Sequence, residues 1–109
     1  MSYPKYQIYK DKSGKFRFRL FAANTKNILH SEGYNTRGAC LNGIASVKRN
    51  ADKKERFVIN KAKTSSKVYF NLVAGNKEVI GTSQMYASRK SLYNGRNSVM
   101  KNAKSPVLD

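Results

Sequence analysis

Residues 34–51 read YNTRGACLNGIASVKRNA, and residues 86–103 read YASRKSLYNGRNSVMKNA. At an offset of 52 residues, fifteen of the 37 positions from Lys15 to Ala51 are identical in the second copy. A repeat of this length indicates one supersecondary unit that has been duplicated. A lone unit of about 50 residues buries too little surface to be comfortably stable. We therefore expect one domain, 1–109, in which repeat one (5–54) and repeat two (55–108) share a core with pseudo-two-fold symmetry.

Each copy has the pattern of three strands followed by a helix. Alternating apolar and polar residues predict strands at 6–10, 15–22 and 28–32, and again at 57–61, 67–74 and 79–83. A helix is expected from a cap at Asn35 or Thr36 to about Arg49, and a second helix at 88–102. Cys40, Ile44 and Val47 recur at helical spacing and predict the buried stripe of the first helix. Residues 106–108 are a candidate for a short terminal strand.

Positive charge is distributed along the whole chain. The 109 residues contain 22 Lys and Arg against 6 Asp and Glu, a formal net charge of +16. Residues 1–54 hold 12 basic and 3 acidic residues, and residues 55–109 hold 10 and 3. Solubility of a small domain needs a net charge of only about 2–8, and self-repulsion of this size costs stability unless a polyanion neutralises it. The composition therefore favours nucleic acid as the partner over an acidic membrane surface.

The sequence offers no convergent set of catalytic groups. His30 is the only histidine, and its counterpart in the second copy is Thr82. The acidic residues fall mostly at turns, strand ends and termini, without a spacing that suggests shared acid–base work. Cys40 is the single cysteine and lies on the predicted buried stripe, which indicates a core residue and leaves no Cys-based metal site. We expect a protein that is not an enzyme and needs no metal, cofactor or small-molecule substrate.

Basic residues supply the candidate binding chemistry. Lys15, Arg17 and Arg19 alternate along one predicted strand face about 7 Å apart, close to the scale of the phosphate repeat of a nucleic acid, although a solvated sheet face gives the same pattern. Aromatic side chains at Tyr9, Phe21, Tyr69 and Tyr93 could stack on bases if exposed, or belong to the core. The candidate nucleic-acid-binding residues are Lys15, Arg17, Arg19, Arg37, Lys48, Arg49, Lys53, Lys54, Arg56, Lys67, Arg89, Lys90, Arg96 and Lys101.

One difference between the copies affects the predicted core. Ile44 in the first helix corresponds to Arg96 in the second, and a buried arginine without a partner is costly. Helix two could be rotated so that Tyr93 or Met100 covers the sheet, Arg96 could contact the partner, or Arg96 could reach solvent along its aliphatic stem. We favour the last interpretation.

Several stretches resemble the YegP-like family of small bacterial proteins: YQIYKDKSGKFRFRLFAAN, SEGY and GIASVKRNA in the first copy, and VYFNLVAGN, IGTSQMY and SVMKNA in the second. The resemblance covers about residues 5–104. It implies an α+β fold in which two tandem β-β-β-α(-β) repeats form one antiparallel sheet with two helices packed on one face. It also makes Glu55–Ile59 and Pro106–Leu108 candidate exchanged strands. The family implies no catalytic residues.

These observations lead to ranked functional hypotheses. The first is a non-catalytic RNA-binding protein, a ribosome component or a ribosome-associated protein that docks on folded rRNA through Lys and Arg contacts to phosphates, beside neighbouring ribosomal proteins. The alternatives are a DNA-binding nucleoid-type protein and a protein-interaction module. No helix-turn-helix, zinc-finger or aromatic RNA-recognition motif is present, so backbone and shape should dominate recognition. With no signal peptide or long apolar run, we expect a cytoplasmic protein, without membrane association and monomeric when free.

Overall fold

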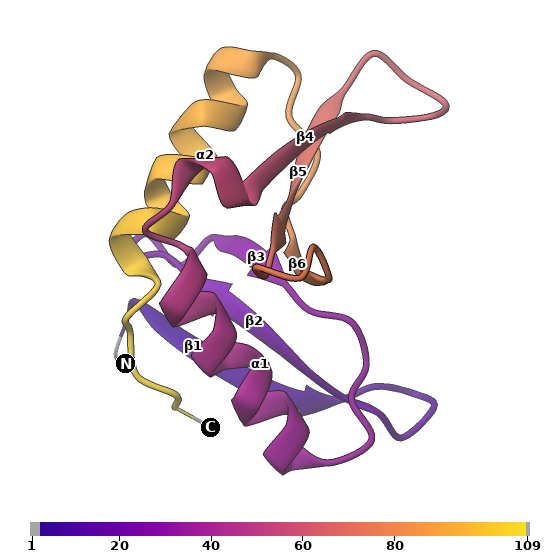
Figure 1. Ribbon diagram of the computed structural model, residues 1–109, viewed down its shortest axis with the longest axis vertical. Coiled ribbons are helices and arrows are strands. Elements are labelled where there is room, and N and C mark those ends of the chain that lie inside the picture. The colour runs from indigo at the N-terminus through magenta and orange to yellow at the C-terminus, as the bar shows by residue number, and fades with distance from the viewer. Residues whose placement is uncertain (1–2, 109) are drawn as a thin grey trace.

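The computed structural model describes residues 3–108. Each copy contributes three strands and one helix, as the alternation and helical spacing predict (Figure 1). The elements are β1 (Lys5–Lys10), β2 (Phe16–Phe21), β3 (Asn27–His30), α1 (Arg37–Asn50), a short 3-10 helix η1 (Lys54–Arg56), β4 (Phe57–Lys61), β5 (Val68–Val73), β6 (Val79–Thr82) and α2 (Arg89–Asn102). The predicted boundaries hold to within two residues. Thr36 and Ser88 cap the two helices through their side-chain oxygens.

The six strands form one antiparallel sheet in the order β1-β2-β3-β6-β5-β4. Each copy makes a three-stranded meander, and the two meanders meet where His30 pairs with Thr82. The pseudo-two-fold axis therefore passes between β3 and β6. Both third strands join their neighbours through a register shift, between Leu20 and Phe21 in one copy and between Leu72 and Val73 in the other. The predicted α+β fold is confirmed, and both copies have the register shift at equivalent positions.

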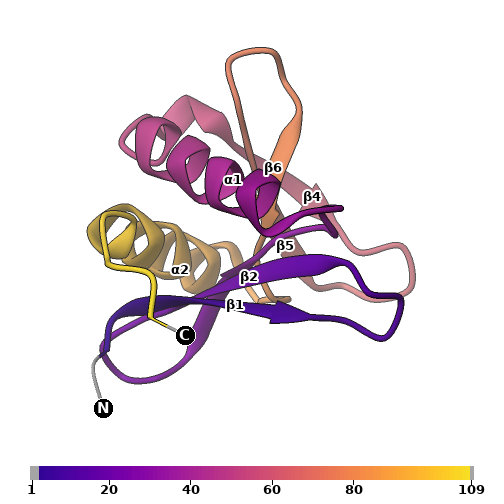
Figure 2. The same ribbon diagram turned by 90° about the horizontal axis from the view of Figure 1, so that it is seen from below.

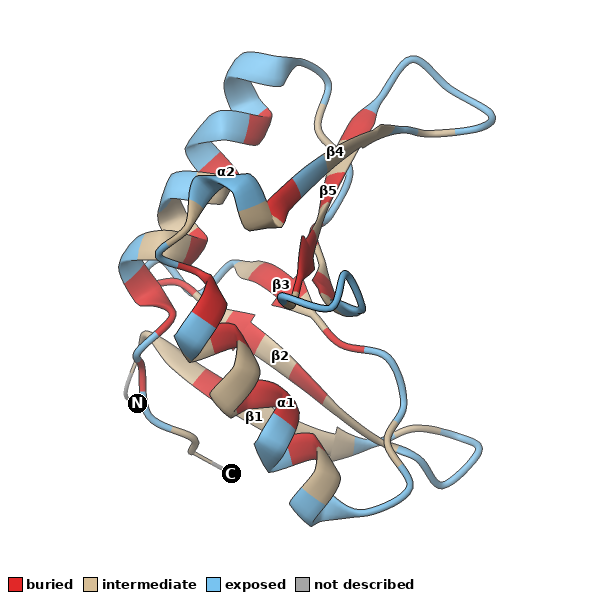
Figure 3. Cartoon of the chain, viewed as in Figure 1, coloured by how far each residue is buried: buried red, intermediate tan, exposed pale blue. Residues whose placement is uncertain are grey.

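Both helices pack on the same side of the sheet and lie side by side (Figures 1 and 2). The core between them and the sheet is made of alternate strand residues and the inward helix stripes, including Phe18, Leu20, Val47, Phe70 and Val99. The exposed residues concentrate on the loops and on the outward turns of the helices (Figure 3). No helix of the described residues covers the opposite side of the sheet, which we call the outer face.

Some residues that are identical in the two copies have a clear structural role. The hydroxyl of Ser31 accepts a hydrogen bond from the backbone N–H of Phe18 at 2.9 Å and donates to the carbonyl of Glu32. Ser83 makes the equivalent bonds in the second copy, to Phe70 and Gln84. Because both serines are buried, removing either hydroxyl would leave a buried backbone donor without a partner. The repeat therefore preserves these residues as part of the scaffold.

Gly43 and Gly95, one in each helix, also have a structural role. We expect Gly43 to allow close approach of the helix, and the structure shows what approaches: a Cβ at Gly43 would lie 2.3 Å from the Tyr34 hydroxyl. In the second copy, Gly95 and Tyr86 repeat this contact. Each tyrosine hydroxyl thus occupies the space that a side chain on the helix would need.

The expectation of exchanged strands is right for one end of the chain and wrong for the other. Val107 pairs in parallel with Tyr6, and the N–H of Tyr6 donates to the carbonyl of Pro106 at 2.8 Å, so the end of repeat two extends the sheet beside β1. The segment Glu55–Ile59 is not exchanged. It begins in η1 and continues as β4, which pairs with β5 of its own repeat.

The side chain of Arg96 reaches toward the surface along its aliphatic stem, which is the interpretation that we favour. Its guanidinium lies over the ring of Tyr93, 4.9 Å from the centroid, and its Nη2 lies 3.4 Å from Asn97 Oδ1. Tyr93 and Asn97 are exposed, whereas Leu92 and Val99, the counterparts of Cys40 and Val47, are buried, so helix two is not rotated. The Nε of Arg96 is buried without a hydrogen-bond partner.

Candidate nucleic-acid interface

The candidate cations lie on two opposite sides of the molecule. Lys15, Arg17, Arg19 and Lys67 share the outward parity of β2 and β5 and belong to the outer face. Arg56, at the end of η1, lines a hollow on the outer face. The helices and the segments that follow them carry the rest: Arg37, Lys48, Arg49, Lys53, Lys54, Arg89, Lys90, Arg96 and Lys101. We call this second group the helix side. One flat surface cannot contact both groups at once.

Arg17 is held in place by an acidic turn. Its Nε lies 2.6 Å from Asp11 Oδ2, and its Nη1 lies 3.3 Å from the carbonyl oxygen of Ser31. The hydrogen bond from Arg17, followed by that from Ser13, keeps the pKa of the Asp11 carboxyl well below its ordinary value. The same hydrogen bond raises the pKa of Arg17. Arg17 is therefore an oriented cation whose charge Asp11 partly offsets.

A row of side chains crosses the outer face at the level of Arg19. Backbone pairing places Gln7, Arg19, His30, Thr82, Asn71 and Val58 in register across all six strands. The Arg19 guanidinium lies 4.1 Å from the centroid of the Tyr9 ring, within cation–π range. Burial, and then the charges of Arg17 and Arg19, lower the pKa of His30 below its ordinary value.

The candidate stacking residues also lie on both sides of the molecule. Tyr9, Phe21 and Tyr69 are half-buried on the outer face, and Tyr93 is exposed on α2. Phe21 packs edge-on against Tyr3, which leaves its ring partly covered. The outer face of the first copy therefore combines aromatic rings with cations, the pairing on which single-stranded nucleic acids stack.

The helix side carries more cations than the outer face. Lys48 reaches over the buried ring of Tyr6 at 5.7 Å, Lys53 pairs with Asp52 at 3.3 Å, and Arg56 donates from Nη1 to Asn50 Oδ1 at 2.8 Å. Lys15, which directly precedes β2 on the outer face, donates from Nζ to Asn35 Oδ1 in the loop before α1. The helix-side residues Arg37, Arg49, Lys54, Arg89, Lys90 and Lys101 are exposed, and so is Lys67 on the outer face.

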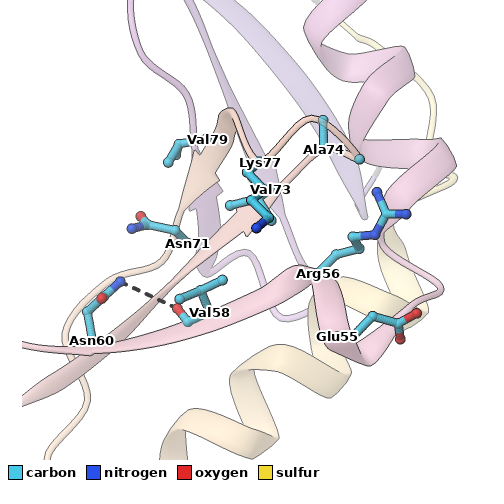
Figure 4. A pocket seen from close by; sticks show the side chains of 10 residues that line it. Glu55, Arg56, Val58, Asn60, Asn71, Val73, Ala74, Lys77 and Val79 are labelled. Carbon is cyan, nitrogen blue, oxygen red and sulfur yellow. Dashed lines mark hydrogen bonds between the residues drawn. The ribbon is translucent and has the colours of Figure 1, made fainter.

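A hollow of about 450 Å³ opens on the outer face of the second copy (Figure 4). Its walls include Val58, Val73 and Val79, and its polar groups include Asn60 and Asn71. Glu55, Arg56, Ala74, Gly75 and Lys77 complete the lining. Apart from Arg56, sequence reasoning missed these residues, because no motif marks them. The signal that could have found them is the loss of bulk between aligned positions, from Phe21 to Val73 and from Tyr9 to Asn60.

Cys40 is fully buried, and burial raises the pKa of its thiol to about 11. Among residues 3–108, no group of three or more His, Cys, Asp and Glu side chains is placed to hold a metal ion. Over the same residues, none of the helices has the length and apolar character required to cross a membrane.

Comparison with known proteins identifies the family. The model of the "Domain of unknown function (DUF1508)" matches residues 11–57 and again residues 64–109. A UPF0339 protein in the ptx operon 5′ region of Stutzerimonas stutzeri is 51% identical over 98 residues, covering 90% of this chain and 87% of that protein. YegP of Yersinia pestis is 41% identical over 108 residues, covering 99% of this chain and 96% of the relative.

Solved structures agree with the architecture. The solution NMR structure of Escherichia coli YegP, a protein of unknown function, has a TM-score of 0.88 at 40% identity and covers 94% of this chain and 88% of that one. The solution NMR structure of a UPF0339 protein from Shewanella oneidensis has a TM-score of 0.85 at 40% identity, with the same coverage. The resemblance to the YegP-like family is confirmed: this chain belongs to the DUF1508 family.

Proposed function

We propose that this DUF1508 protein is a non-catalytic RNA-binding protein that docks on folded RNA, ribosomal RNA in the cytoplasm above all, through contacts from Lys and Arg to phosphates. The observation that carries the proposal is the net charge of +16 on a single small domain. Two ion pairs, Arg17–Asp11 and Lys53–Asp52, are formed within the described residues. Most of the cations are therefore left to an external polyanion, whose binding would release counterions.

The shape of the two faces favours RNA over duplex DNA. Both helices lie flat against the sheet and beside each other, so neither projects as an element that would enter a major groove (Figure 2). The outer face offers instead an uncovered sheet with Arg19 over Tyr9 and with half-buried Phe21 and Tyr69. Open sheets that carry aromatic side chains are a common platform for unpaired RNA bases. Folded RNA supplies both unpaired bases and dense phosphates.

Sedimentation of a cell lysate tests the proposal directly. We expect the protein to travel with ribosomes through a sucrose gradient at low salt and to move to the top after RNase treatment. Migration with free protein at low salt would contradict ribosome association.

Binding measurements at matched salt separate the alternatives. A structured RNA should bind more tightly than duplex DNA, with an affinity that falls steeply as salt rises. Equal affinity for duplex DNA would favour a nucleoid-type role. A salt-insensitive interaction with an acidic protein would favour a protein-interaction module.

A further inference from the structure

The hollow on the outer face lies where the two copies differ in side-chain size. At the positions equivalent to Asn60, Asn71 and Val73, the first copy has Tyr9, Arg19 and Phe21. There the Arg19 guanidinium covers the Tyr9 ring, and Phe21 packs against Tyr3 with 5.8 Å between ring centroids. The second copy replaces these large side chains with smaller ones on an equivalent backbone. The same scaffold therefore presents a filled surface in one half and a hollow in the other.

Each of the two asparagine amides in the hollow has one atom in a hydrogen bond and one atom that a ligand could use. The hydroxyl of Thr82 donates to Asn71 Oδ1 at 2.9 Å, which orients the amide and leaves its Nδ2 as a donor. Asn60 Nδ2 makes a long contact of 3.5 Å with the carbonyl of Val58, which leaves Asn60 Oδ1 as an acceptor. Within the described residues, neither of these two remaining atoms has a hydrogen-bond partner. The hollow thus offers one donor and one acceptor beside apolar walls.

The apolar walls and the rim narrow the class of ligand. Val58, on the edge strand β4, and Val79, at the start of β6, are 43% and 38% exposed, so both offer apolar surface to a ligand. Arg56 and Lys77 line the same hollow (Figure 4). The Arg56 guanidinium is held by its hydrogen bond to Asn50 Oδ1. A flat apolar ring with a hydrogen-bonding edge and an attached anion would satisfy all of these groups. The volume of about 450 Å³ falls within the range of small-ligand pockets.

We propose that this hollow binds a single unpaired base of an RNA, with the adjoining phosphate on Arg56 and Lys77. The inference rests on the RNA-binding function proposed above and names the part of the RNA that the outer face selects. The base would lie against the valines and pair its edge with Asn60 and Asn71. The neighbouring nucleotides would continue along the row through Thr82 and His30 toward Arg19, about 14 Å away across three strand spacings.

Two RNA hairpins provide the test: a fully paired stem and the same stem with one bulged adenosine, titrated at matched salt. The wild-type protein should bind the bulged hairpin about tenfold more tightly, the factor expected for one stacked base. Val73→Phe should remove this preference and leave the affinity for the paired stem unchanged. The variant restores the residue that the first copy has at Phe21, so the backbone can accept it. Met85→Phe, which adds an aromatic ring at an exposed loop position, is the matched control and should keep the preference.

Asn71→Ala provides a second reading that does not depend on filling the hollow. It should reduce the preference for the bulged hairpin severalfold, and circular dichroism of both variants shows whether they fold. Equal binding of the two hairpins by the wild-type protein, or a preference that Val73→Phe leaves intact in a folded variant, overturns the base site but not RNA binding. Failure to bind either hairpin at low salt overturns the proposed function itself, and the base site with it.

Discussion

The face that contacts RNA phosphates can be identified by removing the same charge from each side of the molecule. The outer-face pair is Arg17→Ala with Arg19→Ala, and the helix-side pair is Arg49→Ala with Lys54→Ala. Each double variant loses two positive charges, so both lose the same long-range attraction. A difference between them reports local contacts. Because the outer face combines its cations with aromatic rings and the hollow, we expect the outer-face pair to bind structured RNA more weakly.

The magnitude follows from counterion release. Each lost phosphate contact flattens the slope of log K against log salt by about 0.7 to 0.9, which at 0.1 M salt weakens binding by on the order of fivefold. Two full contacts would give on the order of 25-fold. Asp11 already offsets part of the charge of Arg17 at 2.6 Å, whereas Arg19 has an uncharged tyrosine beneath it. The single variant Arg19→Ala should therefore account for most of the loss, and Arg17→Ala for less.

Fluorescence anisotropy of a labelled RNA hairpin, recorded from 50 to 300 mM salt, measures both the affinity and the slope. Thermal melts of each variant check that the fold is retained. A larger loss for the helix-side pair would refute the assignment of the contact face. Equal losses would also refute it, because they would show that RNA phosphates do not prefer the outer face.

Three further predictions concern single groups. NMR of the imidazole should show that His30 titrates below pH 6.5 in the free protein, and that its pKa rises in Arg19→Gln or when RNA binds. Because the unfolded chain binds this proton more readily, the stability that neutral His30 contributes should be lost as the pH falls through the lowered pKa. The thiol of Cys40 should react with Ellman's reagent at pH 8 only as fast as the protein opens, since its pKa is about 11 and it is buried. Tyr6→Phe removes a hydroxyl that donates to the Ala103 carbonyl at 2.7 Å, and urea unfolding should show a loss of about 1–3 kcal/mol.

The repeat and the alternation predicted most of the fold because each depends on local information. The stretch KFRFRLFA has a strict period of two, and β2 occupies it with Phe18 and Leu20 buried. The register shifts in the two copies were not predicted, because they are set by the turns at Asn24 and Asn76, where the following residues Thr25 and Lys77 take positive φ angles of 68° and 71°. Local pattern thus predicts which residues form strands, but not how one strand slips against the next.

The candidate interface was less predictable for a different reason. Lys15, Arg17 and Arg19 were correctly placed together, since parity along one strand settles their side. The list as a whole mixed both sides of the molecule, because charge along a sequence carries no information about which layer covers which. The pairing of Arg17 with Asp11 and the hollow beside Val73 both depend on side chains from different strands. Those contacts become visible only when the register and the bulk of neighbouring residues are known.

Tandem duplication gives this sheet a property that two identical units could not have. In a symmetric pair of single-copy units, every cation and every hollow on one half would recur on the other, and a bound strand could run in either direction. Here the identities, such as Ser31 with Ser83, preserve the scaffold, while Arg19 and Asn71 occupy equivalent positions with different chemistry. One end of the outer face carries fixed cations and the other an open hollow. A strand with phosphates at one end and an unpaired base at the other would therefore fit this face in a single polarity.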